Sequence, residues 1–385
     1  MLNIDEIKLS KELIRFPSIT PVDAGAIKFL SKKLKSLGFK CQILEFKDKK
    51  SASIKNLYAR IGTKQPNICY AGHTDVVPPG NYKDWTTNPF NPIIKNNYLI
   101  GRGANDMKSS IACFVSAVSK YLKGNSKING SISFLITGDE EGAAINGTKK
   151  VVDYLRKKKE KINFCIVGEP TNPKKLGEMI KIGRRGSLSG ALEITGSQGH
   201  VAYPHLSINP IDTLLDISKK LKNTKFDRGN KNFQPSNLEI TSIDVNNKAH
   251  NVIPARAKSQ FNIRYNNIHT ASSLKKKINS IIKNICTKNK CNFKVTYESS
   301  GESFLTKPEK TIYMAKKIIK KITKINPKFS TTGGTSDARF IRKISPCLEF
   351  GLVNKSMHKV DECVSVTDLR RLTKIYHQIL IEYFK

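Results

Sequence analysis

Long uncharged apolar runs are missing from this sequence of 385 residues, which argues against a helical membrane protein. The first eight residues begin an amphipathic helix and lack the pattern of a secretory signal. The eight cysteines form no Cys-x-x-Cys pair, and Cys69, Cys165 and Cys347 lie inside apolar runs, as small core residues do. We therefore expect a cytoplasmic protein without a membrane partner.

Acidic residues are also scarce, because 67 Lys and Arg face only 31 Asp and Glu, giving a formal net charge of +36. Only 13 of the basic residues are Arg, and Lys, Ile and Asn are abundant throughout. The sequence has no RNA-binding aromatic motif, zinc finger or basic tail, so we expect no specific nucleic-acid partner. Non-specific binding of polyanions at low salt and faster capture of an anionic substrate stay open.

The length favours two domains. Up to residue 177 helical and strand patterns alternate, which is typical of an α/β domain. We expect helices at 4–16, 24–37, 107–122 and 147–156, and strands at 40–46, 57–61, 67–72, 131–136 and 164–167.

The pattern then changes to a β-α-β-β-α-β order, which predicts a ferredoxin-like α+β insert. Its expected strands lie at 180–195, 237–245, 259–265 and 293–298, and its helices at 209–221 and 271–286. Helix 309–324, strand 346–350 and helix 366–383 return to the first domain. The sequence therefore predicts one domain of residues 1–179 and 294–385, and an inserted domain of residues 180–293.

Five short segments each end an apolar run with residue types that bind metals. They are 68–75, 101–108, 132–142, 164–170 and 350–358, and they carry His73, Asp75, Asp106, Glu140, Glu141, Glu169 and His358. Each has an ordinary alternative: a lone His is usually a loop residue, a Glu-Glu pair is usually a solvated turn, and Asp106 could cap a helix. Acids and His at the ends of five apolar runs nevertheless indicate a metal site, because buried charges are costly unless paired or metal-bound.

Neutral imidazoles with carboxylates suit Zn²⁺, with Co²⁺ or Mn²⁺ as substitutes. A two-metal site needs a bridging carboxylate and further ligands for each ion. His73, Asp106 and Glu169 can serve one ion, and Asp106, Glu141 and His358 the other.

Two acids are left without a metal in this arrangement. Asp75 follows His73 by two residues and is expected to accept the second N–H of that imidazole. Glu140 is left beside a metal-bound water, which makes it a candidate general base.

At these residues the chain resembles the M20 metallopeptidase family. The family's His-x-Asp motif, its Gly-rich segment ending in Asp-Met-Lys, its Glu-Glu pair, the strand-end Glu and the late His all occur in order. Segments 183–187, 199–205, 251–254 and 333–337 most resemble the branch that hydrolyses the succinyl amide of N-succinyl-LL-2,6-diaminopimelate. His250 and Ala338 depart from that branch. Deacetylases of N-acetylornithine and aminoacylase-like relatives remain the alternative.

The resemblance implies a zinc-peptidase-like catalytic domain with a central mixed sheet, two Zn²⁺ ions, and a cis peptide between Asp106 and Met107. It also implies that the insert is a lid through which the chain forms a homodimer, and that His200 reaches the partner's cleft as a catalytic donor. The implied substrate-binding residues are Arg184, Asn251, Arg264, Thr335 and Asn354. Arg suits an anionic substrate because a guanidinium binds carboxylates in a forked geometry.

Overall fold

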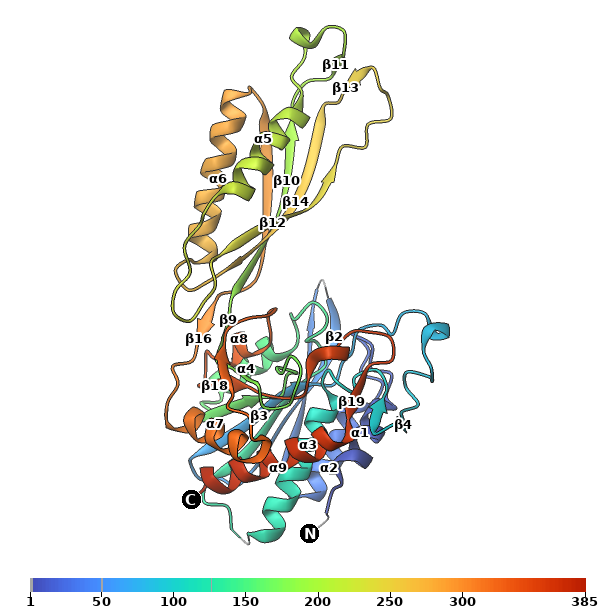
Figure 1. The fold of residues 1–385 in the computed structure, drawn as a ribbon, viewed down its shortest axis with the longest axis vertical. Coiled ribbons are helices and arrows are strands. Elements are labelled where there is room, and N and C mark those ends of the chain that lie inside the picture. The colour runs from blue at the N-terminus through green and yellow to red at the C-terminus, as the bar shows by residue number, and fades with distance from the viewer. Residues whose placement is uncertain (1–2, 50, 126) are drawn as a thin grey trace. The chain divides into compact units, whose positions relative to one another are not determined.

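The computed structural model describes residues 3–49, 51–125 and 127–385, and it divides into two compact units (Figure 1). Unit 1 comprises Met1–Ile182, Thr306–Ser330 and Ser336–Lys385, and unit 2 comprises Gly183–Leu305 and Thr331–Thr335. The boundary expected at residue 293 falls inside strand β15 (Asn292–Gly301). Because β15 pairs with β10 (Gly186–Thr195) over nearly its whole length, the inserted unit extends to Leu305.

Unit 1 is built on a mixed sheet of eight strands in the order β1-β2-β6-β3-β7-β18-β8-β17. Strands β6, β3, β7 and β18 run parallel to one another, whereas β1, β2 and β8 each have an antiparallel neighbour. The strands are β1 (Lys40–Asp48), β2 (Ser51–Ile61), β3 (Asn67–His73), β6 (Ser131–Thr137), β7 (Phe164–Val167), β8 (Met179–Lys181), β17 (Lys328–Ser330) and β18 (Cys347–Glu349). This confirms the central mixed sheet.

Strands β6 and β7 are buried at every position, as is usual for parallel strands covered on both faces, and β7 is an unbroken apolar run. Among the helices, α1, α3 and α9 pack on one another, α7 packs on α9, α2 packs on β1 and β2, and α4 packs on β2 and β6. Their bounds are α1 (Glu6–Ile14), α2 (Ala26–Ser36), α3 (Lys108–Gly124), α4 (Thr148–Lys157), α7 (Lys310–Thr323), α8 (Ala338–Ile341) and α9 (Val366–Tyr383). Each long helix lies within a few residues of the range that its apolar periodicity predicted.

An aromatic cluster joins the sheet to α3 and α9. Tyr70 stacks on Phe114 at a centroid separation of 4.4 Å, and Tyr376 meets both rings edge-on. The Tyr376 hydroxyl donates to the Phe350 carbonyl at 2.6 Å, so its polar end is satisfied inside the core. Strands β3, β7 and β18 also bring Cys69, Cys165 and Cys347 into register as buried free thiols.

Several short elements had no clear signal in the sequence. Strands β4 (Ile93–Lys95), β5 (Tyr98–Ile100) and β19 (Cys363–Ser365) form a small sheet. The single strand expected at 180–195 is in fact β8, β9 (Gly183–Arg184) and β10, because the chain leaves unit 1 for unit 2 between Ile182 and Gly183. Such three-residue strands are fixed by pairing partners distant in sequence, which periodicity does not reveal.

Unit 2 confirms the ferredoxin-like order, with four antiparallel strands arranged β12-β14-β10-β15 and two helices. The remaining elements are α5 (Pro210–Asn223), β12 (Asn237–Asp244), β14 (Arg256–Tyr265) and α6 (Ala271–Lys288). A separate β-ribbon pairs β11 (Gly199–His200) with β13 (Val252–Ile253), and β16 (Phe304–Leu305) pairs with β9.

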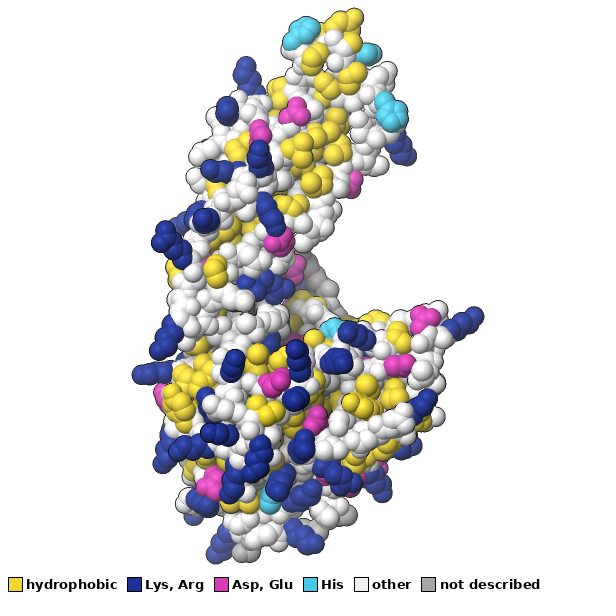
Figure 2. Space-filling model, viewed as in Figure 1, with side chains coloured by type: hydrophobic (Ala, Val, Ile, Leu, Met, Phe, Trp, Pro, Cys, Tyr) yellow, Lys and Arg dark blue, Asp and Glu magenta, His cyan; other side chains and the backbone are white. Residues whose placement is uncertain are grey.

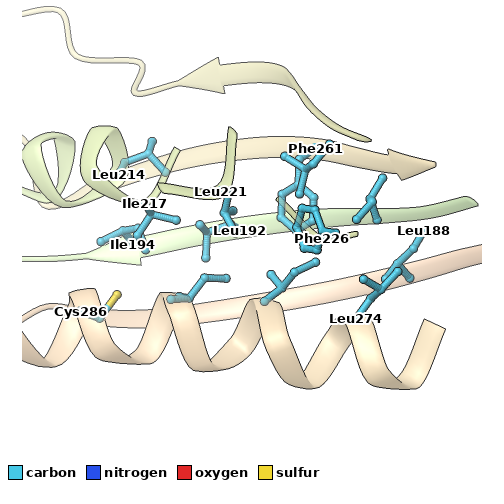
Figure 3. Close-up of a cluster of buried hydrophobic side chains, with 14 of the residues drawn as sticks. Leu188, Leu192, Ile194, Leu214, Ile217, Leu221, Phe226, Phe261, Leu274 and Cys286 are labelled. Carbon is cyan, nitrogen blue, oxygen red and sulfur yellow. The ribbon is translucent and has the colours of Figure 1, made fainter. Parts of the chain in front are cut away.

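Both helices of unit 2 cover the same face of its sheet (Figure 3). Alternate residues of β10 and β14, such as Leu192, Ile194 and Phe261, point into this core. They meet Leu214, Ile217 and Leu221 from α5 and Leu274 from α6. The residues between them face the other side of the sheet and are mostly polar. The two-residue period of the strands and the helical period of the two helices therefore predict the same core.

Lys and Arg side chains are scattered over the face of the molecule shown in Figure 2, on both units. This distribution fits solvated charges more than a single basic binding stripe. None of the described helices combines the length and apolar character needed to cross a bilayer.

Candidate metal centre

The sheet topology explains why residues far apart in sequence meet in unit 1. Strands β6, β3 and β7 are neighbours and parallel, so their carboxyl ends lie at one edge of the sheet. His73 ends β3, the pair Glu140–Glu141 follows β6, and Glu169 follows β7. The edge of the sheet therefore collects the acids and the imidazole.

Two further side chains reach this edge from loops. Asp106 lies just before α3, where its peptide bond to Met107 is cis, as the resemblance implied. His358 follows the short helix η3 (Asn354–Ser356) and has a left-handed backbone, with φ of 61°.

Asp106 lies between the two imidazoles. Its Oδ1 is 3.1 Å from His73 Nε2, and its Oδ2 is 3.3 Å from His358 Nε2. His358 Nε2 is also 2.9 Å from Glu141 Oε1, and His73 Nε2 is 3.8 Å from Glu169 Oε1. Each carboxylate oxygen of Asp106 thus faces a different imidazole, as a bridging ligand requires.

Two groups of potential ligand atoms each lie within 4.8 Å of one another: His73 with Glu140 and Glu169, and His73 with Asp106 and Glu141. The structure therefore places Glu140 within reach of the same ion as Glu169. Two imidazoles among carboxylates are a donor set that Zn²⁺ and related ions accept, so the residues present fit two metal ions.

The electrostatics of the cluster favour positive charge. Hydrogen bonds with Asp106 and Glu141 raise the pKa of His358 to about 10. Burial raises the pKa of Asp106, but its contacts with His358 and His73 outweigh burial and bring it below its usual range. Burial and the nearby charge of Glu169 hold the pKa of Glu140 well above its usual range. These acids are stabilised as anions only where a cation faces them.

Asp75 makes contacts that differ from the expectation. His73 Nδ1 lies 2.9 Å from the main-chain carbonyl oxygen of Asp75, whereas the nearer carboxylate oxygen is 3.7 Å away. The carboxylate instead accepts the backbone N–H groups of Glu140 at 3.1 Å and Glu141 at 2.9 Å. Asp75 therefore orients the ring through its backbone and the Glu-Glu turn through its side chain.

Sequence reasoning missed two other buried acids near the ligands. Asp139 accepts the N–H groups of Ala144, Ile145 and Asn146, and so closes the loop that carries the Glu-Glu pair. Glu362 accepts several N–H groups of the Asp106 loop. Their positions, one residue before the Glu-Glu pair and four after His358, were the available signals.

The other expected site residues lie mostly in unit 2, in two groups. Arg184 donates to the carbonyl of Gly334 at 3.1 Å, beside Thr335. Arg264 lies on β14 opposite Ser187 of β10, near enough to Arg185 that its charge contributes to lowering the pKa of that guanidinium, after burial.

The second group is at the β-ribbon of unit 2. His200 is exposed and pairs with Val252, and the carbonyl of Asn251 accepts the N–H of Val201 at 3.1 Å. Asn354 is in unit 1, where its N–H donates to the Asn172 carbonyl at 2.9 Å. Of the two departures, His250 is exposed next to Asn251, and Ala338 is buried at the start of α8.

A mixed sheet with two imidazoles and several acids at its strand ends defines a candidate dinuclear metal hydrolase. A family model described as peptidase family M20/M25/M40 matches residues 69–382. The chain belongs to this family.

Curated relatives named succinyl-diaminopimelate desuccinylase cover the whole chain. The protein from Pelagibacter ubique (strain HTCC1062) is 68% identical over 384 residues, covering 100% of both chains. The protein from Wolbachia pipientis subsp. Culex pipiens is 50% identical, covering 100% of this chain and 94% of the relative.

Solved structures share the fold. Aminopeptidase PepT from Bacillus cereus ATCC 10987 has a TM-score of 0.80 at 19% identity, with 100% of both chains covered. The Bacillus subtilis YXEP protein, described as a dinuclear metal binding peptidase from M20 family, has a TM-score of 0.73 at 14% identity, covering 98% of this chain and 97% of that one. At these identities the likeness supports the two-domain fold alone.

Proposed function

We propose that the chain hydrolyses the succinyl amide of N-succinyl-LL-2,6-diaminopimelate, giving succinate and LL-2,6-diaminopimelate. The full-length identity of 68% to a succinyl-diaminopimelate desuccinylase supports the substrate. The observation that carries the chemistry is Asp106, whose two carboxylate oxygens face two different imidazoles. N-acetylornithine is the competing substrate, since a deacetylase of this family would use the same ligands.

The proposed ligand sets are His73, Asp106 and Glu169 for one Zn²⁺, and Asp106, Glu141 and His358 for the other, with Co²⁺ as a substitute. When bound, two such ions acidify a water molecule and polarise the amide carbonyl.

Glu140 is the proposed general base. It takes a proton from the attacking water and delivers it to the nitrogen of the departing amine. Burial raises its pKa, which brings its basicity closer to that needed near neutral pH. Asp75 supports this role because its carboxylate accepts the backbone N–H of Glu140 and so holds the main chain from which that side chain projects.

Unit 2 is the proposed lid and dimerisation domain, and unit 1 the catalytic domain. Arg184, Arg264, Asn251 and Thr335 of unit 2, with Asn354 of unit 1, are proposed to bind the carboxylates of the substrate. His200 is proposed to donate to the tetrahedral oxyanion in the site of the partner subunit. Its exposure at the β-ribbon is compatible with reaching another chain.

The function is tested with the Zn²⁺-loaded protein and with Glu140→Gln. The protein should hydrolyse N-succinyl-LL-2,6-diaminopimelate faster than N-acetylornithine, and chelation should abolish turnover. Glu140→Gln should bind two metal equivalents, counted by elemental analysis, and lose nearly all turnover. Loss of a metal in this variant would instead make Glu140 a ligand, and preference for N-acetylornithine would overturn the proposed substrate.

The sharing of the site is tested by mixing inactive variants. His200→Ala should keep both metals and the dimer but lose about 10²–10³ in kcat, the usual cost of one oxyanion donor. When His200→Ala and Glu140→Gln subunits exchange, one site of each heterodimer contains both intact residues, so activity should partly return. Absence of recovery after confirmed exchange would contradict a shared site.

A further inference from the structure

Glu362 is a buried carboxylate whose hydrogen bonds all go to the loop that carries Asp106. Its Oε1 accepts the N–H of Asn105 at 2.6 Å and that of Asp106 at 2.9 Å. Its Oε2 accepts the N–H of Gly103 at 2.9 Å. The side chain is 1% exposed, so these backbone donors have no competing water.

Arg102 completes this arrangement and connects it to one further segment, that of Pro78. Its Nη1 donates to Glu362 Oε2 at 2.8 Å and to the carbonyl of Lys359 at 3.2 Å. Its Nη2 donates to the carbonyl of Pro78 at 3.3 Å. The ring of Trp85 covers the guanidinium at 5.1 Å and shields it from solvent. A planar five-donor group is the side chain suited to join three separate segments.

The ion pair of Arg102 and Glu362 joins the loop that carries Asp106 to the loop that carries His358. Glu362 lies four residues after His358, and Arg102 lies four residues before Asp106. The ion pair therefore fixes the separation of Asp106 and His358, which with Glu141 form one of the two proposed ligand sets. His73 and Glu169, the other ligands of the first set, are held by strands β3 and β7 instead.

We propose that Arg102 and Glu362 are positioning residues for the metal ion held by Asp106, Glu141 and His358, and that they affect its affinity more than that of the other ion, which shares Asp106 but has its remaining ligands at strands β3 and β7. This inference rests on the two-metal centre proposed above. Partners that orient a ligand typically change metal affinity by about 10–100-fold when lost. Glu362→Gln would keep the shape of the side chain. Its amide NH₂ group would, however, replace one acceptor oxygen and face the N–H donors of the Asp106 loop.

The test is a metal titration of Glu362→Gln against a chelating indicator, with Zn²⁺ as the probe. The wild-type protein should bind two equivalents tightly, whereas the variant should bind one tightly and the second about 10–100-fold more weakly. Glu362→Gln should weaken binding of this ion less in the His358→Ala background than in the wild-type protein, because part of its effect acts through His358.

Glu6→Gln is the matched control. Glu6 is also buried in unit 1 and bonded, to Ser116 at 2.9 Å and Lys120 at 3.2 Å, but between helices α1 and α3. It should lower stability yet bind two equivalents with wild-type affinities. If Glu362→Gln does not fold, Arg102→Lys carries the test, because Lys keeps the charge but not the fork.

Unchanged affinity for the second equivalent in a folded Glu362→Gln or Arg102→Lys protein would overturn the inference, as would equal weakening of both equivalents. Failure of the wild-type protein to bind two equivalents would refute the two-metal proposal itself.

Discussion

Unit 1 and unit 2 fill their interiors with different kinds of side chain. Unit 1 buries charged and polar groups among its apolar residues, including His73, Asp106, Lys108, Glu349 and Glu362. The core of unit 2 is a contiguous cluster of Leu, Ile, Phe, Tyr, Ala and Cys between one sheet face and two helices (Figure 3). Burying a charge is costly unless it is paired, whereas burying an aliphatic side chain is favourable. The comparison indicates that the buried charges of unit 1 lower its stability and serve its chemistry. The apolar core of unit 2, in contrast, mainly stabilises the fold.

Asp106→Asn should break the comparison most strongly, because it removes the only side chain placed in both proposed ligand sets. We expect metal binding to fall for both ions and kcat/KM to drop by more than about 10³-fold, beyond the usual loss for one transition-state contact. Amide exchange in α5 and α6 should be unchanged. Asp153→Asn, at an exposed acid of α4, is the control and should behave like wild type. Full retention of two metals would show that Asp106 bridges nothing.

Leu192→Ala tests the opposite side of the comparison. Leu192 is 3% exposed in the core of unit 2, so its truncation should cost about 2–5 kcal/mol of unfolding free energy. Urea unfolding measures this loss, and the metal content should stay at the wild-type value. Ala191→Ser, at the exposed neighbouring position, should change stability by less than about 0.5 kcal/mol. A loss of metal in Leu192→Ala would mean that the chemistry of unit 1 depends on the core of unit 2.

Asp227→Asn tests a half-buried acid of unit 2 and should have the smallest effect of the three substitutions. The Asp227 carboxylate accepts the N–H of Gly229 at 2.7 Å and the amide of Asn266 at 2.6 Å. Burial raises its pKa, but these bonds and those from Ser236 outweigh burial and lower it. We expect the substitution to cost about 1–3 kcal/mol at neutral pH, as for other lost hydrogen bonds to a charged group.

The pH dependence of that loss has a defined sign. Because the folded pKa lies below the unfolded one, the stabilisation is present above the unfolded value of about 3.9 and is lost as the pH falls through the folded value. The difference in unfolding free energy between wild type and Asp227→Asn should therefore shrink in acid. A difference that grows in acid would contradict the lowered pKa.

The elements of both units were predictable where periodicity is strong. The helices α5, α6 and α9 and the fully buried strand β6 have the expected extents to within a few residues. The meeting of His73, Glu140, Glu141 and Glu169 was also predictable, since these residues follow apolar runs and parallel strands bring such positions together. Amphipathic patterns and strand ends are local properties, and a sequence displays them directly.

Contacts between loops were not predictable. Nothing in the sequence around Asp75 indicates that its carboxylate accepts the N–H groups of Glu140 and Glu141, which lie 65 and 66 residues away. The same holds for Glu362 and the Asp106 loop. These bonds depend on the path of irregular segments, and no repeating pattern of side chains records that path.

The interrupted course of unit 1 has a consequence for biosynthesis. Unit 2 occupies one continuous stretch, Gly183–Leu305, apart from Thr331–Thr335, whereas unit 1 resumes only at Thr306. A ribosome adds about 5–20 residues per second, and domains generally fold as units during synthesis. The elements of unit 2 are therefore all synthesised before β18, α9 and His358 exist. The nascent chain carries Asp106 and Glu141 for most of translation without His358, so the ligand set proposed for these three residues can be completed only near the end of synthesis.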